Sequence, residues 1–318
     1  MPRNTAVPRR SAGRRRLVRV TAGCAVLLGL AGYVAVSCVP GGKGLSGCVV
    51  RAAGAPADRS ADDEGESYTL TADQAANAAT IAAVGTTGRM PERAVTIALA
   101  TALQESALRN IDYGDRDSLG LFQQRPSQGW GTPAQILDPV YSAGKFYEHL
   151  AEVPGYSRLP LTEAAQRVQR SGFPQAYAKH EPDATLLAAA LTGRSRATLD
   201  CAPSQAAAAG PGDAAKVRAE LVRDFGDGVL PATEAAGPPG GDTVSVPVAR
   251  VRESGADAEG ADRRGWELAH WAVARAEALR IDRVVFGDRV WRAGEGWRTE
   301  REEGADTSGS EVRMRIAQ

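Results

Sequence analysis

The sequence predicts a mainly α-helical protein, in which an N-terminal transmembrane helix precedes an all-α domain and a small C-terminal α+β element. Three observations lead to this prediction. Residues 20–39 contain no charged residue, and about twenty apolar residues are enough to cross a bilayer as a helix. Between residues 70 and 195, helix caps recur and no stretch alternates as a half-buried strand does. After residue 263, one helical pattern is followed by two short strands around Gly287-Asp288, which indicates a β-hairpin.

These patterns divide the chain into segments of different character. In order, they are an Arg-rich cytoplasmic segment (1–19), a transmembrane anchor or signal (20–39), a linker (40–69), an all-α domain (70–201), a linker with one helix (202–262), a helix–hairpin element (263–298) and a disordered tail (299–318). The all-α domain has the size of a single core, whereas the linkers are rich in small, polar and charged residues.

The apolar run at residues 20–39 follows a segment that holds several arginines and no acid. Positive residues favour the cytoplasmic side, so an uncleaved helix would leave the chain from about residue 40 outside the membrane. Two alternatives stay open, a signal peptide with a cleavage site at Ala35-Val-Ser37 and a lipid attached to Cys38. All three readings export the body of the protein, and the first makes the cytoplasmic membrane a partner.

Charge and residue spacing exclude two kinds of partner. The formal net charge of the chain is +0, so the sequence lacks the basic excess that nucleic-acid binding requires. No Cys-x-x-Cys or His-x-x-x-His spacing occurs, so a zinc site has no ligand set. We therefore expect no nucleic acid, no metal and no other cofactor.

Only two cysteines, Cys48 and Cys201, belong to the exported body. A lone pair of cysteines in an oxidising compartment usually forms a disulfide. Such a bond would join the two ends of the all-α domain. The alternative is two unpaired thiols.

Capping residues predict the helices of the all-α domain. Thr71 and Gln74 form a capping box for a helix that runs to about residue 84, and Pro91 opens a second helix that runs to about residue 108. A further capping box lies at Thr132 and Gln135. Additional helices are expected at 140–150, 162–170 and 183–191, then at 213–225 and 265–280 beyond the domain.

Glu105 ends the almost entirely apolar helix that begins at Pro91. A carboxyl group at the end of a buried helix is partly desolvated, which raises its pKa and suits it to general acid catalysis. The loop that follows, residues 111–124, is polar and punctuated by glycine. Its hydrogen-bonding and aromatic residues are typical of a cleft that binds sugars and protonates a glycosidic oxygen.

Glu105-Ser106 and the later Ser118-Leu-Gly-Leu-Phe-Gln-Gln124 resemble the signature of lytic transglycosylases and goose-type lysozymes, in which Glu-Ser precedes a Gly-Leu-Met-Gln stretch. The resemblance covers residues 70–194 and implies a lysozyme-like fold and peptidoglycan glycan strands as the substrate. It makes Glu105 the catalytic acid/base and places Gln123 beside the sugar. Residues 265–297 are similar to the end of a small α/β module of some actinobacterial cell-wall proteins.

The sequence departs from this family at two points. Phe122 stands where Met is usual. The family's Ala-Tyr-Asn-Ala-Gly motif, whose Tyr lies near the catalytic Glu, is absent, so Gln169 with Ser171, or Tyr177, is expected to take that place. The residues expected to bind substrate are Ser106, Tyr113, Ser118, Gln123, Gln124, Trp130, Gln169 and Tyr177.

The number of carboxylates bears on the reaction at the β-1,4 bond between N-acetylmuramic acid (MurNAc) and N-acetylglucosamine (GlcNAc). An inverting hydrolase needs a second carboxylate to activate water, and Asp112, Asp115 and Asp117 are candidates, although Asp is also an ordinary turn residue. A lytic transglycosylase works with Glu105 alone, which favours that reaction. The alternative is a catalytically weak or inactive peptidoglycan-binding envelope protein of the same fold.

Overall fold

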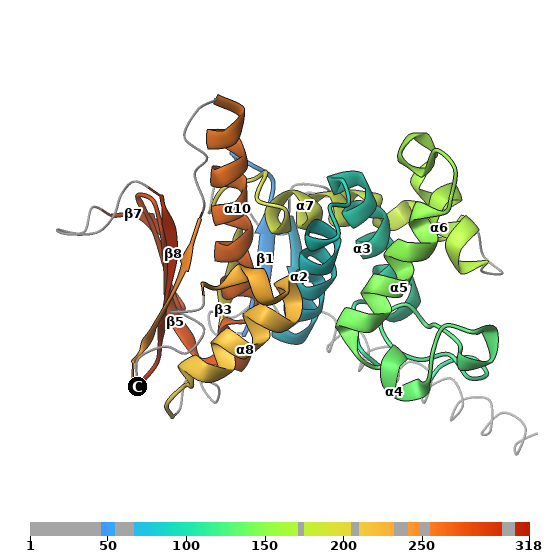
Figure 1. The fold of residues 1–318 in the computed structure, drawn as a ribbon, viewed down its shortest axis with the longest axis horizontal. Helices are drawn as coiled ribbons and strands as arrows, with labels where there is room; N and C mark the ends of the chain where they lie inside the picture. The colour runs from blue at the N-terminus through green and yellow to red at the C-terminus, as the bar shows by residue number, and fades with distance from the viewer. Residues whose placement is uncertain are drawn as a thin grey trace, which may run out of the picture. The chain divides into compact units, whose positions relative to one another are not determined.

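The computed structural model describes residues 46–54, 67–170, 175–204, 210–231, 241–248, 255–300 and 309–318. All of them belong to one unit that begins at Ser46. Helix α10 (Gly255–Ala274) lies between a five-stranded sheet and a group of helices that carries a smaller sheet (Figure 1).

The prediction of a mainly α protein with an all-α domain is wrong, because the described residues contain two antiparallel sheets. The smaller sheet has the order β2-β1-β3 and consists of β1 (Gly47–Arg51), β2 (Ser67–Leu70) and β3 (Leu199–Ala202). These strands lie at the two ends of the helical domain, and β1 and β2 pack on α7 (Glu181–Leu191), whereas β3 packs on α10. Two of them are four residues long, which is too short for alternation to be recognised in the sequence.

The predicted transmembrane helix is likewise absent from the helices that the structure describes. Within the described ranges, every helix is too short or too polar to cross a membrane. Residues 20–39, to which the anchor or signal was assigned, lie outside these ranges.

The helices between the strands of the smaller sheet lie at or close to the predicted ranges. They are α2 (Ala72–Thr87), α3 (Glu92–Ser106), α4 (Pro133–Ile136), α5 (Pro139–Ala151), α6 (Leu161–Gln169) and α7, with 3-10 turns η1 (Pro126–Gln128), η2 (Tyr156–Arg158) and η3 (Ala178–His180). However, α6 begins at Leu161 after Pro160, and α7 begins at Glu181. Both capping boxes, at Thr71 with Gln74 and at Thr132 with Gln135, are confirmed.

Helix α3 is the centre of the helical domain. Ten consecutive residues from Ala94 to Leu103 are buried, and α3 contacts α2, α5, α6 and α7. A helix that is covered on all sides needs apolar residues around its whole circumference, which explains the composition of this segment.

The predicted disulfide is confirmed. Cys48 on β1 and Cys201 on β3 are bonded, and they face each other directly in the antiparallel register. The bond therefore joins the first and last strands of the helical domain, which are 153 residues apart in the sequence.

The C-terminal region is larger than the predicted helix–hairpin element. The predicted hairpin is present as β5 (Ile281–Phe286) and β6 (Arg289–Arg292). Three further strands extend it, β4 (Thr243–Pro247), β7 (Gly296–Thr299) and β8 (Glu311–Ile316), in the order β4-β8-β5-β6-β7. Strand β8, which pairs with both β4 and β5, comes from the segment expected to be a disordered tail. In this strand the buried residues Val312, Met314 and Ile316 alternate with charged residues. The composition of the segment is therefore polar overall, and the strand was not recognised.

Helix α10 packs on α2, α7 and β3 on one side and on β5 and β8 on the other (Figure 1). Its second half, residues 265–274, is buried throughout, because both sides are covered. Gly265 permits the close approach to β5, since a Cβ at this position would lie 1.9 Å from the ring of Phe286. Helix α11 (Ala276–Leu279) then leads into β5.

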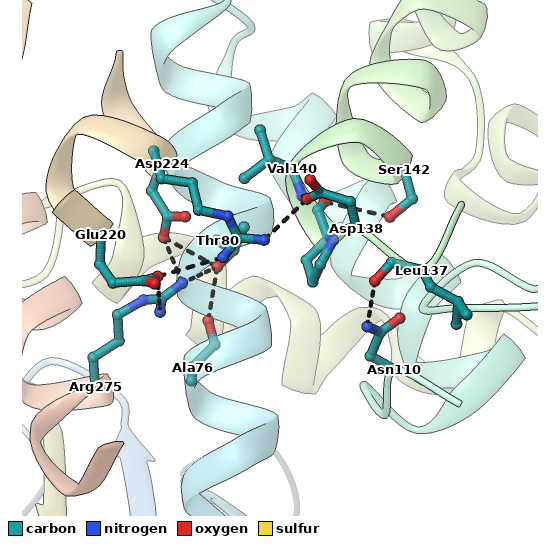
Figure 2. A network of polar contacts seen from close by, with 12 residues as sticks. Ala76, Thr80, Asn110, Leu137, Asp138, Val140, Ser142, Glu220, Asp224 and Arg275 are labelled. Atoms are coloured by element: carbon teal, nitrogen blue, oxygen red, sulfur yellow. Dashed lines mark hydrogen bonds and ion pairs between the residues drawn. The ribbon is translucent and has the colours of Figure 1, made fainter. Parts of the chain in front are cut away.

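Buried polar contacts join this C-terminal region to the helical domain. Asp224, on α8 (Ala214–Phe225), is fully buried and accepts hydrogen bonds from Thr80 at 3.0 Å and Trp271 at 2.8 Å. Arg275 pairs with Asp224 at 2.7 Å and with Glu220 at 2.9 Å (Figure 2). These contacts connect α8 and the end of α10 to the middle of α2.

The same network reaches the beginning of α5. Arg223 on α8 pairs with Asp138 at 2.9 Å, and Asp138 caps α5 through the backbone N–H of Val140. The neighbouring carbonyl of Leu137 accepts a hydrogen bond from Asn110, which lies in the loop after Glu105 (Figure 2). The C-terminal region is thereby connected to the loop that carries the candidate site.

Candidate active site

Glu105 lies in the last turn of α3 and is half-buried. The helix ends there because Ala107 and Leu108 adopt left-handed conformations, with φ of 53° and 58°. Two successive non-glycine residues in this region are uncommon and turn the chain sharply. The backbone N–H groups of these two residues close the helix by donating to the carbonyls of Leu103 and Ala102.

Two side chains donate hydrogen bonds to the Glu105 carboxyl group. The hydroxyl of Tyr177 lies 2.6 Å from Glu105 Oε1 and is itself fully buried. Gln169, the last residue of α6, also bonds Glu105, and its amide donates to the carbonyl of Phe122 at 2.7 Å. Ser171, the other residue named for this place, lies outside the described residues.

Burial raises the pKa of Glu105 above its ordinary value, and this is the largest influence on it. The hydrogen bonds from Tyr177 and Gln169 stabilise the carboxylate and lower the pKa in part. The net shift is upward, so the group holds a proton at a higher pH than an exposed glutamate does. Such a group can donate a proton to a leaving oxygen and take one back as a carboxylate.

Glu105 lines a groove of about 1050 Å³ between the loop after α3, the end of α5 and the end of α6. Five of the residues expected to bind substrate also line this groove, namely Ser118, Gln123, Gln124, Trp130 and Gln169. Tyr177 is buried and lies outside the groove lining, and its hydroxyl contacts the lining residue Glu105.

The loop from Ser118 to Gln124 is a tight turn. Leu119 and Gln124 exchange two backbone hydrogen bonds, of 2.9 Å and 3.0 Å. Gly120 has φ of 74°, and a Cβ there would lie 2.7 Å from the carbonyl oxygen of Ile136, so the position requires glycine. Gln123 also has a positive φ, of 47°, and this strained conformation brings its side chain to the groove.

Ser106 and Gln124 hold the site together. The Ser106 hydroxyl is buried and donates to the carbonyl of Leu121 at 2.8 Å, which joins the end of α3 to the loop. Gln124 is only 2% exposed, and its amide donates to the carbonyl of Ser142 on α5 at 3.0 Å. Both residues therefore position the loop, and their expected contact with substrate stays a prediction.

The three aromatic residues of the region lie in different environments. Trp130 lines the groove, half-buried, with its ring centroid 4.4 Å from that of His149. Tyr113 is 63% exposed and lies outside the groove lining. Phe122 is fully buried and stacks on Phe146. Of the three, Trp130 is therefore the aromatic residue that lines the groove.

The three candidates for a second carboxylate also differ. Asp117 accepts hydrogen bonds from Arg125 at 2.8 Å and from the backbone and hydroxyl of Ser127. These bonds hold the pKa of Asp117 far below its usual range and fix it as a structural member of the loop. Asp115 is exposed and lines the groove, while Asp112 does not. Asp115 is thus the candidate that shares the groove with Glu105.

Apart from Glu105 and Asp115, sequence reasoning missed the charged or titratable residues of the groove. Arg116, Arg125, Arg167, Arg170, His149 and Glu152 all line it. They come from three separate segments, and surface charges on loops and helix ends carry no pattern that groups them. A signal was present at the end of α6, where Arg167 lies two residues before Gln169 and Arg170 directly follows it.

Within the described part of the chain, no group of three or more histidine, cysteine, aspartate or glutamate side chains is arranged to hold a metal ion. In the comparison with protein families, residues 239–310 match the family described as "VldE, C-terminal domain". The matched stretch spans β4 to β7, ends before β8 and contains none of the groove residues. No curated protein matches the chain.

Proposed function

We propose that the protein is a peptidoglycan-cleaving enzyme that acts on the β-1,4 bond between MurNAc and GlcNAc as a lytic transglycosylase. The observation that carries the proposal is the half-buried carboxyl group of Glu105, whose pKa is raised by burial in a polar groove. The resemblance of Glu105-Ser106 and of the loop 118–124 to the lytic transglycosylase signature gives independent support. The Cys48–Cys201 disulfide supports an oxidising compartment, where cell-wall glycan is found.

In the proposed reaction, protonated Glu105 transfers its proton to the glycosidic oxygen as the bond from C1 of MurNAc to that oxygen breaks. The resulting carboxylate then accepts the proton of the MurNAc 6-hydroxyl, whose oxygen bonds to C1. The product is a 1,6-anhydro ring, and Glu105 ends in its protonated form. Tyr177 and Gln169 orient the carboxyl group and stabilise its ionised form between the two steps.

The environment of the three predicted candidates, Asp112, Asp115 and Asp117, favours transglycosylation over inverting hydrolysis. Inversion requires a second carboxylate to activate a water molecule. The carboxylate of Asp117 already accepts hydrogen bonds from Arg125 and Ser127, and Asp112 lies outside the groove lining. Asp115 is 92% exposed at its side chain, so it lacks the protected surroundings of a tuned catalytic base.

Substituting Glu105→Gln in the full chain tests the proposal. The variant keeps the shape of the side chain and removes the proton donor, so release of muropeptides from cell walls should fall by about a thousandfold. Binding of glycan strands should remain. Asp115→Asn is the matched control, because a transglycosylase should retain its activity when this carboxylate is removed. Unchanged activity of Glu105→Gln would contradict the proposal.

A second candidate is a glycan-binding protein without turnover. It is favoured by the two hydrogen bonds that stabilise the Glu105 carboxylate and oppose its protonation. For such a protein, neither the wild type nor Glu105→Gln releases muropeptides, and both bind glycan equally. The same pair of measurements therefore separates the two candidates.

A further inference from the structure

The beginning of α5 holds the loop that follows α3 through two backbone carbonyls. The carbonyl of Leu137, two residues before the helix, accepts a hydrogen bond from the side chain of Asn110 at 2.7 Å (Figure 2). The carbonyl of Ser142, in the first turn of the helix, accepts one from the side chain of Gln124 at 3.0 Å. Asn110 and Gln124 are the two ends of residues 110–124, which we call the groove loop. The position of the first turn of α5 therefore helps to set the position of the groove loop.

Asp138 lies between these two carbonyls in the sequence and has two partners. Its Oδ1 accepts a hydrogen bond from the backbone N–H of Val140 at 2.9 Å, which caps α5. The same oxygen lies 2.9 Å from Nη2 of Arg223, which belongs to α8. Arg223 thus contacts the turn on which the groove loop depends, although α8 comes after the last strand of the helical domain in the sequence.

The backbone around Arg223 is fixed by its neighbour Asp224, which is buried. Asp224 accepts a hydrogen bond from Trp271 on α10 at 2.8 Å and pairs with Arg275, which directly follows α10, at 2.7 Å (Figure 2). These contacts hold α8 on the C-terminal region. The ion pair of Arg223 with Asp138 is therefore a defined contact between the C-terminal region and the support of the groove loop.

This ion pair contributes little to the free energy of folding, because the side chains of Arg223 and Asp138 are 38% and 46% exposed. Catalysis, by contrast, depends on the placement of reacting groups to within about 1 Å. A contact that adds little stability can therefore still be important for activity when it sets the position of a loop beside the reacting group.

We propose that Arg223 is a positioning residue for the groove, whose ion pair with Asp138 holds the groove loop in the arrangement that Glu105 requires. The C-terminal region then contributes to activity as well as to stability. This inference rests on the proposed function for the reaction that is affected. Neither Arg223 nor Asp138 lines the groove, so the effect passes through the backbone of Leu137 and Ser142.

The first test is Arg223→Gln in the full chain. The value of kcat for muropeptide release should fall by about two- to fivefold, the factor that a surface ion pair can supply. KM should change less, because the substitution removes no group that contacts the glycan. Arg223→Lys keeps the positive charge and should restore part of kcat.

A double-mutant cycle tests the path of the effect. Asp138→Asn removes the charge but keeps a residue type that caps helices well, so α5 should stay capped. It should lower kcat by the same factor as Arg223→Gln, and the two substitutions together should lower it no further. Arg196→Gln is the matched control, because it removes a surface ion pair of equal length, to Asp262 on α10, and neither residue lines the groove. This control should leave kcat unchanged.

Amide hydrogen exchange measures the coupling without turnover. In Arg223→Gln, peptides from residues 110–124 should exchange about two- to fivefold faster than in the wild type, whereas Arg196→Gln should leave their exchange unchanged. Unchanged exchange of the groove loop in Arg223→Gln, additive losses of kcat in the double variant, or an unchanged kcat would overturn the positioning role. Failure of the proposed function looks different. In that case the wild-type protein releases no muropeptides, while exchange of the groove loop still responds to Arg223→Gln and not to Arg196→Gln.

Discussion

The carboxyl group of Glu105 is subject to two opposing influences on its pKa. Burial raises the pKa, and the hydrogen bonds from Tyr177 and Gln169 lower it. A general acid is active only while protonated, so activity should be lost as the pH rises through the raised pKa of Glu105. The position of this alkaline limb is a direct measure of the balance between the two influences.

Replacing Tyr177 with phenylalanine should shift the alkaline limb of kcat/KM to higher pH. The change removes a hydrogen bond that stabilises the carboxylate, so the pKa of Glu105 rises further. The ring is retained in its buried position, which limits the effect on folding. The measurement is muropeptide release between pH 4 and pH 9. An alkaline limb that stays in place or moves to lower pH would contradict the assigned role of this hydrogen bond.

At the scale of single residues, the sequence identified Glu105 and also proposed Tyr177 and Gln169 as its neighbours. It did so through the resemblance of Glu105-Ser106 and of the loop 118–124 to the lytic transglycosylase signature, because the apolar helix alone would not have singled out Glu105. The backbone contacts of Ser106 and Gln124 were not predicted, since a polar residue next to a site looks the same in sequence whether it faces a ligand or a backbone carbonyl. Only the fold shows that their partners are Leu121 and Ser142.

The loop from Ser118 to Gln124 depends on backbone conformations that few residues adopt. Gly120→Ala should destabilise the protein by about 1–2 kcal/mol through the left-handed conformation alone. The close contact with the carbonyl of Ile136 should add to this and displace Gln123, so activity should fall more than stability. Urea unfolding and muropeptide release on the same sample measure both effects.

Gly144→Ala is the matched control for this loop. Gly144 lies within α5, where an added Cβ meets no atom within 4 Å. Alanine in a helix interior is favoured over glycine by about 0.5–1 kcal/mol, so this variant should be as stable as the wild type or more stable. If Gly120→Ala behaved as Gly144→Ala does, the loop would not need its observed conformation.

At the scale of elements, helices were predicted well and strands poorly. A capping box is a local sequence pattern, so it predicts the start of a helix without tertiary information. This was the case for Thr71 with Gln74 and for Thr132 with Gln135. Strand β3 has only four residues. Strands β4 and β8 lie in segments whose composition predicted a linker and a disordered tail. A strand of that length is stabilised by the partner it pairs with, and pairing between distant segments is not encoded locally.

At the scale of the whole molecule, the C-terminal region is part of the structure that supports the groove. Helix α10 covers α2 and α7, and the buried carboxylate of Asp224 is neutralised by Arg275. Arg223 then connects α8 to Asp138 at the beginning of α5. The boundary at residue 201, predicted from composition, therefore divides a shared core.

Arg275→Met tests whether this shared core is needed. The variant leaves Asp224 buried without its cation, which should lower the free energy of unfolding by about 3–5 kcal/mol. Arg223→Met, which removes a surface ion pair, should cost less than about 1 kcal/mol. Chemical denaturation should show one cooperative transition for both variants. Separate transitions for the helical domain and the C-terminal region would show that the two fold independently.

The central claim, that Glu105 cleaves glycan strands without a second carboxylate, is tested most directly by mass spectrometry of the muropeptides released from cell walls by the full-length protein. If Glu105 acts alone, the released products end in 1,6-anhydro-MurNAc, and Glu105→Gln releases none of them. Products with a reducing end would identify a hydrolase and contradict the transglycosylase. Release of no product by the folded wild-type protein would contradict cleavage altogether.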